Sequence, residues 1–189
     1  GSRLQGHPDM KGTPGVDMSS GSLGLGISSA CGMALSAKYN NKDYRVYSIL
    51  GDGELEEGQV WEAAMAAAHY KLDNLTAFVD YNGLQIDGNI TDVMNPEPIA
   101  DKFIAFGWNV IVVDGHNHAQ IKDAIEAAKT VKGKPTMVVC RCIKGKDVSF
   151  MENQYGWHGT APNQEQRDQA IAELDEKLAA IEAEIAKEA

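Results

Sequence analysis

The sequence lacks any uninterrupted apolar run of about 18 residues, the length that a helix needs to cross a bilayer. No signal peptide precedes the first expected strand. Cysteine is scarce, and Cys140 and Cys142 stand two residues apart in a strand-like run, without the spacing of a metal site. We therefore expect a cytoplasmic protein with no membrane partner, whose three thiols stay reduced.

Basic residues are also few. The chain has 17 Lys and Arg against 27 Asp and Glu, a net charge of -10. Without a basic surface it cannot neutralise a phosphate backbone, so we expect no nucleic-acid partner. Much of the acidic excess lies in residues 163–189, which we expect to form an amphipathic C-terminal helix. Its apolar stripe must be buried either on its own domain or on a partner. The stripe consists of Ile171, Leu174, Leu178, Ile181 and Ile185.

The chain has 189 residues, 43% of them hydrophobic, which suffices for one α/β domain with a packed core. Strand-like and helix-like runs alternate along it, which predicts a parallel sheet with helices on both faces. We expect strands at residues 45–50, 75–81, 108–114 and 136–143. We expect helices through Leu35, at 55–70, and from Asn117, which with Gln120 forms a capping-box-like start. Long irregular stretches, often functional, are expected at 6–26, 83–98 and 144–162.

The turn Gly51-Asp52-Gly53 directly follows the first expected strand. Parallel sheets bind ligands at the carboxyl ends of their strands, and a glycine turn there lets the backbone approach a ligand. The helix that follows offers free N–H groups to an anion. An aspartate in the same loop would repel phosphate unless a divalent cation lay between them. Carboxylate and phosphate oxygens both suit Mg²⁺.

A second metal ligand is expected at the end of the neighbouring strand. Asn82 directly follows the expected strand at 75–81 and stands about one βαβ unit after Asp52. The two side chains should therefore emerge side by side at one edge of the sheet. The turn from Asn82 to Leu84 can add a backbone carbonyl as a third ligand. This pair of residues, each after an apolar strand, is more specific than a lone Gly-Asp-Gly turn.

The stretch from Gly51-Asp52-Gly53 to Asn82 resembles the thiamine diphosphate motif of transketolases. Four further stretches match that family in the same order, and together the matches cover about residues 1–162. They are Gly6-His7-Pro8-Asp9, Gly21-Ser22-Leu23-Gly24, the run from Asp80 to Gly88, and Trp157-His158-Gly159. The resemblance implies a thiamine diphosphate-binding fold in which residues 1–162 form the diphosphate-side domain.

The resemblance also implies roles for individual residues. Asp52, Asn82 and the carbonyl of Leu84 would hold Mg²⁺ or Ca²⁺. Gly53 and Glu54 would open the helix that meets the diphosphate. Other implied cofactor contacts are Gly21, Ser22, Leu23, Asn82 and His158.

Two histidines, His7 and His158, match catalytic histidines of the substrate channel, and an imidazole can move protons near neutral pH. Glu57 matches an acidic residue of the family's dimer interface. His69, His116 and His118 lack such context, and we expect them to be structural.

The family carries a further segment before the Gly6-His7 motif and a separate pyrimidine-binding domain. Gly1-Ser2 fits the family sequence just before that motif. On the C-terminal side, the expected helix follows the diphosphate-side domain. The resemblance therefore implies the N-terminal subunit of a split transketolase, in a homo- or hetero-oligomer. Its partner would be a C-terminal subunit carrying the pyrimidine-binding domain, and its substrates sugar phosphates. The alternatives are another thiamine enzyme, such as a deoxyxylulose-phosphate synthase, or an inactive fragment.

Overall fold

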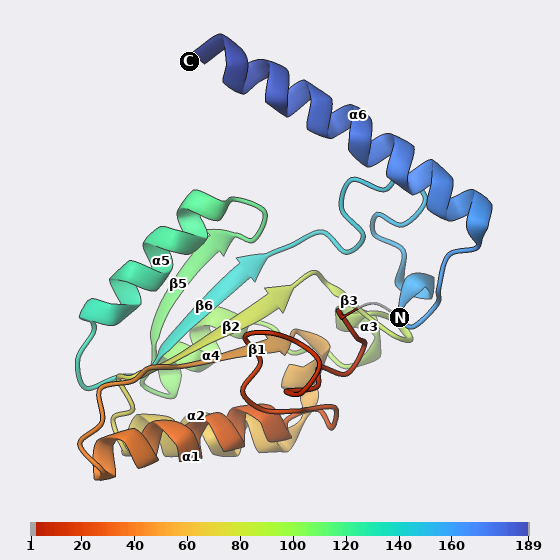
Figure 1. Cartoon of the computed structure of the whole chain (residues 1–189). Coiled ribbons are helices and arrows are strands. Elements are labelled where there is room, and N and C mark those ends of the chain that lie inside the picture. Colours follow the sequence, from red (N-terminus) through yellow and green to blue (C-terminus); the bar gives the residue numbers. More distant parts are fainter. Residues whose placement is uncertain (1–2, 189) are drawn as a thin grey trace.

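Four parallel strands form the central sheet of the computed structural model, which describes residues 3–188 (Figure 1). Their order across the sheet is β1-β2-β6-β5, so the chain crosses over between β2 and β5. This confirms the predicted α/β class with a parallel sheet. The strands are β1 (Val46–Gly51), β2 (Leu75–Tyr81), β5 (Asn109–Asp114) and β6 (Thr136–Arg141).

Three helices cover one face of the sheet and a fourth covers part of the other, as predicted. The first face packs against α1 (Leu25–Tyr39), α2 (Gly58–His69) and α4 (Ile99–Ala105), which share one buried cluster with β1, β2 and β6. On the other face α5 (His118–Thr130) packs over β5 and β6. Because α5 does not reach the edge strand β1, Ile49 on that face remains exposed.

Several predicted boundaries were wrong. The expected helix at 55–70 begins as a 3₁₀ turn, η1 (Gly53–Glu56), and only then becomes α2. The expected long loop at 83–98 contains a small hairpin and a short helix, followed by α4, which the sequence patterns did not indicate. These elements are β3 (Leu84–Gln85), β4 (Gly88–Asn89) and α3 (Ile90–Val93). The cap at Asn117 is as predicted, because its Oδ1 accepts a hydrogen bond of 3.1 Å from the Gln120 N–H.

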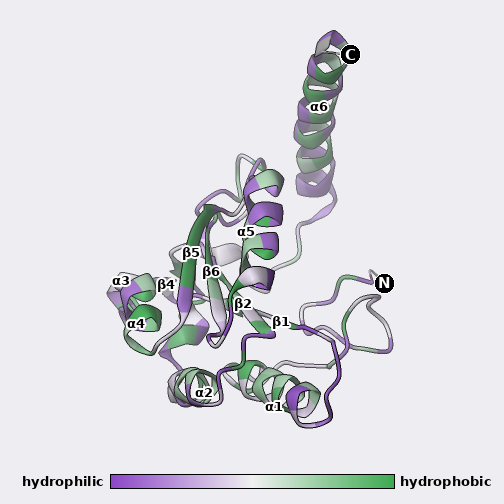
Figure 2. Ribbon diagram, turned by 90° about the vertical axis from the view of Figure 1, so that its left-hand side faces the viewer, coloured by the Kyte–Doolittle hydropathy of each residue, from purple (hydrophilic) through white to green (hydrophobic). Residues whose placement is uncertain are grey.

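The C-terminal helix α6 (Gln164–Glu188) projects away from the sheet and its covering helices (Figures 1 and 2). It follows the 144–162 stretch, which contains the 3₁₀ turn η2 (Tyr155–Trp157). No helix among residues 3–188 is long and apolar enough to cross a membrane. Cys31, Cys140 and Cys142 are unpaired, and burial raises the pKa of the Cys31 thiol to about 11. Gly1 and Ser2 lie outside the described residues.

Candidate functional site

The structure brings Asp52 to the turn that follows Asn82. Asp52 comes directly after β1 and Asn82 directly after β2, and these two strands are hydrogen-bonded neighbours. The Asp52 Oδ2 atom accepts a hydrogen bond of 2.5 Å from the Gly83 N–H, and its Oδ1 atom accepts one of 2.8 Å from the Gly53 N–H. The parallel register, rather than closeness in sequence, therefore places the two candidate ligands together.

The amide of Asn82 is oriented by its neighbours. Its Nδ2 donates to the Asp80 carboxylate at 3.1 Å, and its Oδ1 accepts from the Leu84 N–H at 3.0 Å. Since a carboxylate only accepts hydrogen bonds, Asp80 sets which end of the amide is nitrogen. The amide oxygen is therefore turned toward the backbone turn that carries the Leu84 carbonyl.

Asp52 is 1% exposed, so its charge is almost fully removed from water. Burial raises the pKa of its carboxyl group, hydrogen bonds from Gly83 and Gly53 lower it, and the nearby Asp80 raises it further. A divalent cation would offset this desolvation. The available donors are a carboxylate, an amide oxygen and a backbone carbonyl, all of them oxygens, which is the donor set that Mg²⁺ and Ca²⁺ prefer. These residues fit the implied metal.

Glu54 connects two glycine loops of the site, which the sequence did not indicate. Its Oε1 atom accepts from the Gly24 N–H at 2.9 Å and its Oε2 atom from the Gly51 N–H at 3.1 Å. Gly24 has a φ of +80°, and a Cβ atom there would lie 3.0 Å from the Glu57 Cβ. The two carboxylate oxygens of Glu54 therefore hold the loop before α1 against the end of β1.

His7 lies beside the first of these loops. The imidazole Cδ2 atom is 3.2 Å from the position that a Cβ atom would take on Gly21, so any larger residue at position 21 would press on the ring. Ser22 and Leu23, the next residues of the loop, are exposed. The predicted cofactor contacts Gly21, Ser22 and Leu23 thus present an open surface next to His7.

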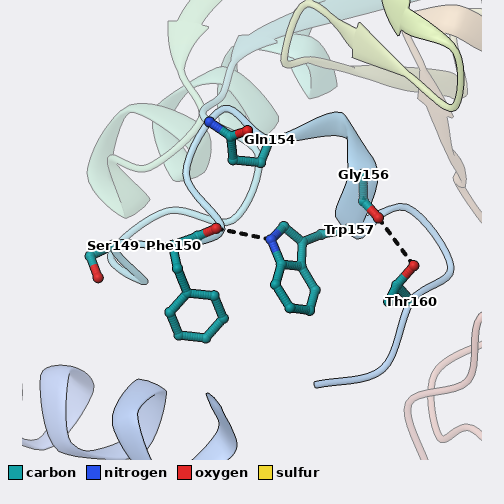
Figure 3. Close-up of a pocket in the computed structure, with 6 residues that line it drawn as sticks. All are labelled: Ser149, Phe150, Gln154, Gly156, Trp157 and Thr160. Carbon is teal, nitrogen blue, oxygen red and sulfur yellow. Dashed lines mark hydrogen bonds between the residues drawn. The ribbon is translucent and has the colours of Figure 1, made fainter. Parts of the chain in front are cut away.

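His158 is exposed and lies on a separate part of the chain. It follows Trp157, whose Nε1 donates to the Phe150 carbonyl at 2.9 Å. The Trp157 ring packs edge-on against the Phe150 ring, with 5.3 Å between the ring centroids. These two rings line a pocket of about 350 Å³ in the 144–162 stretch (Figure 3). None of the predicted site residues, all within the described chain, lines that pocket. Within residues 3–188, no hydrogen bond or ion pair joins His158 to Asp52.

Comparison with known proteins identifies the domain. A family model described as "Transketolase, thiamine diphosphate binding domain" matches residues 1–187. The chain is 46% identical over 177 residues to the 6-deoxy-6-sulfo-D-fructose transketolase subunit SqwG of Clostridium sp. (strain MSTE9), covering 94% of this chain and 64% of that protein. It is 41% identical to one subunit of the apulose-4-phosphate transketolase of Phocaeicola vulgatus, covering 97% of this chain and 65% of that protein. The chain therefore spans just under two thirds of these relatives.

Solved structures agree with this assignment. A transketolase from Pichia stipitis in complex with sedoheptulose-7-phosphate matches with a TM-score of 0.81 at 32% identity, over 90% of this chain and 27% of that one. The transketolase of Campylobacter jejuni matches with a TM-score of 0.78, also at 32% identity, over 89% of this chain and 27% of that one. On the family match, the relatives and the fold, the chain belongs to the transketolase family and contains its thiamine diphosphate-binding domain.

Proposed function

We propose that this chain is the diphosphate-binding part of a transketolase, which transfers a two-carbon ketol unit from a ketose phosphate to an aldose phosphate. One observation carries the proposal: the Gly83 N–H donates a hydrogen bond to Asp52 and so joins the ends of β1 and β2. It supports a metal site in which Asp52, Asn82 and the Leu84 carbonyl hold Mg²⁺ or Ca²⁺. The transketolase names of the relatives favour this interpretation over a deoxyxylulose-phosphate synthase.

Thiamine diphosphate, when bound, supplies the chemistry that breaks and remakes the carbon–carbon bond. The residues of this chain bind and orient it. Gly53 and Glu54 open the 3₁₀ turn η1 after β1 and would shape the backbone that meets the diphosphate, Gly53 through its N–H bond to Asp52 and Glu54 through its bonds to Gly24 and Gly51. Gly21, Ser22 and Leu23 offer the exposed loop surface beside His7.

We further propose that His7 and His158 move protons at the substrate oxygens, which gain and lose charge during ketol transfer. Both histidines are exposed, so both are accessible to a substrate that enters from solvent. His7 already lies at the Gly21 loop. His158 is carried by the 144–162 stretch and would reach the same substrate from another side.

We propose that the complete active site includes a second chain. The predicted metal and cofactor residues do not line the 350 Å³ pocket, nor the groove of about 690 Å³ between the 8–20 segment, α1 and β1. This supports a site in which another surface encloses the cofactor. We propose a C-terminal transketolase subunit with a pyrimidine-binding domain, assembled with this chain into a cytoplasmic oligomer containing dimer contacts at Glu57. Such an enzyme would act on sugar phosphates, as in the pentose phosphate pathway.

Calorimetric titration of thiamine diphosphate in the presence of Mg²⁺, with the assembled enzyme, tests the metal site. Asp52→Ala and Asn82→Ala should each abolish metal-dependent binding, whereas Asp123→Ala, on the exposed side of α5, should leave it unchanged. Circular dichroism of each variant separates lost binding from lost folding. Unchanged affinity in a folded Asp52→Ala or Asn82→Ala variant would show that the metal site is wrongly assigned.

A further inference from the structure

The apolar stripe of α6 has the spacing of a coiled-coil seam. Its five residues are separated alternately by three and four positions, which is the heptad pattern in which core positions repeat along one side of a helix. Each of them is between 41% and 61% exposed. They are Ile171, Leu174, Leu178, Ile181 and Ile185.

Helix α6 is attached to the 144–162 stretch through residues outside the apolar stripe. The Glu173 carboxylate accepts from the Ser149 N–H and from the Ser149 hydroxyl, each at 2.7 Å, and Lys177 forms an ion pair with Asp147. At roughly 100° per residue, the centre of the stripe lies about 120° around the helix from Glu173. Lys177 borders the stripe and Glu173 lies further from it, so the attachment runs beside the stripe, whose five residues stay exposed and do not dock on their own domain.

The residues that flank the stripe are mostly acidic. One flank carries Asp168, Asp175 and Glu182, and the other carries Lys177 and Glu184. Lys177, the one cation at these flanking positions, is already paired with Asp147. The surface around the seam is thus negative, and it repels other negative surfaces such as anionic lipid.

These charges disfavour a second copy of α6 as the occupant. An antiparallel pair would set the acidic flank of one helix against the same flank of the other. A parallel pair would gain only the attraction between Lys177 and Glu182 of the second copy, and Lys177 already has a partner. A helix with cations at its flanking positions would instead meet Asp175, Glu182 and Glu184 with opposite charge, whereas Asp168 is already paired with Arg167.

We propose that the α6 stripe docks an amphipathic helix of another protein chain, with Leu, Ile or Val at its heptad core positions and Lys or Arg beside them. Burial of the two apolar seams drives the association. The flanking charges select a basic helix over an acidic one. The proposal rests on α6 alone and stands whether or not the Asp52 site binds a metal.

A labelled synthetic peptide of about three heptads, with Ile and Leu at its core positions and Lys at its flanks, serves as the probe in fluorescence anisotropy with the full chain. We expect saturable binding that weakens as NaCl rises from about 0.05 M to about 0.5 M, because salt screens the flanking pairs. A peptide with the same core and Glu at its flanks should not bind.

Two matched variants test the apolar seam. Leu178→Gln, on the stripe, should weaken binding by about 10-fold or more, whereas Ala179→Gln, one residue further and off the stripe, should leave it unchanged. Both are exposed substitutions in a helix, so both proteins should fold. Equal binding of the two peptides, equal affinity of the two variants, or no binding at all would overturn the proposal. So would a concentration-dependent dimer in sedimentation that Leu178→Gln dissociates, since the occupant would then be a second copy.

Discussion

Glu54 shows how one side chain can hold together two segments of the proposed binding site. Each of its oxygens accepts a backbone N–H, one from Gly24 and one from Gly51. The two loops it joins carry the proposed ring contacts and the proposed metal ligand. Its role follows from the meeting of residues 30 positions apart, which no local pattern in the sequence indicates.

We predict that Glu54→Gln destabilises the protein by about 1–3 kcal/mol. Glutamine keeps one acceptor oxygen but turns an NH₂ group toward the other N–H, so a part-buried, charge-assisted hydrogen bond is lost. Urea unfolding of the purified chain measures the change in the free energy of unfolding. Glu62→Gln, exposed on α2, is the matched control and should change it by less than about 0.5 kcal/mol. Equal free energies of unfolding for the two variants would show that Glu54 does not hold these segments together.

His158 provides a second test at the scale of single residues. We predict that His158→Ala lowers turnover of the assembled enzyme by about 10²–10⁴-fold if the imidazole moves a proton in the reaction. Because His158 is exposed, the melting temperature should hardly change. His118→Ala, at the exposed start of α5, should affect neither quantity. Near-normal turnover with a lowered melting temperature would instead make His158 a packing residue of its loop.

At the scale of elements, the sequence was sufficient where a pattern is local and strongly periodic. The strand at 75–81 matched β2 in full, and Asn117 capped α5 as predicted. It was insufficient where short elements depend on distant partners. The hairpin β3–β4 has two residues in each strand, too few for a period to appear, and the Gln85 side chain contacts η1 by donating to Glu56 at 2.7 Å. The proximity of Asp52 and Asn82 was predictable because consecutive strands of a parallel sheet usually lie side by side, as β1 and β2 do here.

The attachment of α6 to the body should depend on pH. The Ser149 N–H, followed by the Ser149 hydroxyl and the Gln169 side chain, lowers the pKa of Glu173 below its usual 4.5. A lowered pKa in the folded state means that the contact contributes above pH 4.5 and is lost as the pH falls through the folded value. We predict that hydrogen-exchange protection of the Ser149 amide, corrected for intrinsic exchange, stays level from neutral pH down to about pH 4.5. It should fall as the pH drops through the lowered pKa of Glu173.

Two variants separate this contact from general acid unfolding. Glu173→Gln should lower the protection of the Ser149 amide already at neutral pH, since the charged acceptor is gone. Glu176→Gln, an exposed carboxylate about one turn further along α6, should retain the protection of the parent protein. Protection that persists well below the pKa range of Glu173 would show that other contacts hold α6 in place.

At the scale of the whole molecule, the chain has two regions for which we propose a binding partner. One is the sheet edge with Asp52, Asn82 and the exposed loop of Ser22 and Leu23; the other is the seam of α6. The first combines the buried carboxylate of Asp52 with the exposed loop beside it, and the second presents apolar side chains between acidic ones. This difference in chemistry is consistent with the two roles proposed for them, binding of a charged cofactor and docking of a helix.

We predict that the purified chain alone has no transketolase activity with a ketose phosphate donor and an aldose phosphate acceptor. The proposed cofactor residues line neither the 350 Å³ pocket nor the 690 Å³ groove, and the loop of Ser22 and Leu23 is exposed, so bound cofactor would remain open to water on one side. Water protonates and releases reactive species that an enclosed site protects.

A coupled assay that follows the aldose released from the donor measures the rate. Adding a purified C-terminal subunit with a pyrimidine-binding domain should restore turnover, saturating at a fixed ratio of the two chains, whereas the same addition to Asp52→Ala should not. Turnover by the chain alone, unchanged when the preparation is depleted of other proteins, would show that the site is complete without a partner.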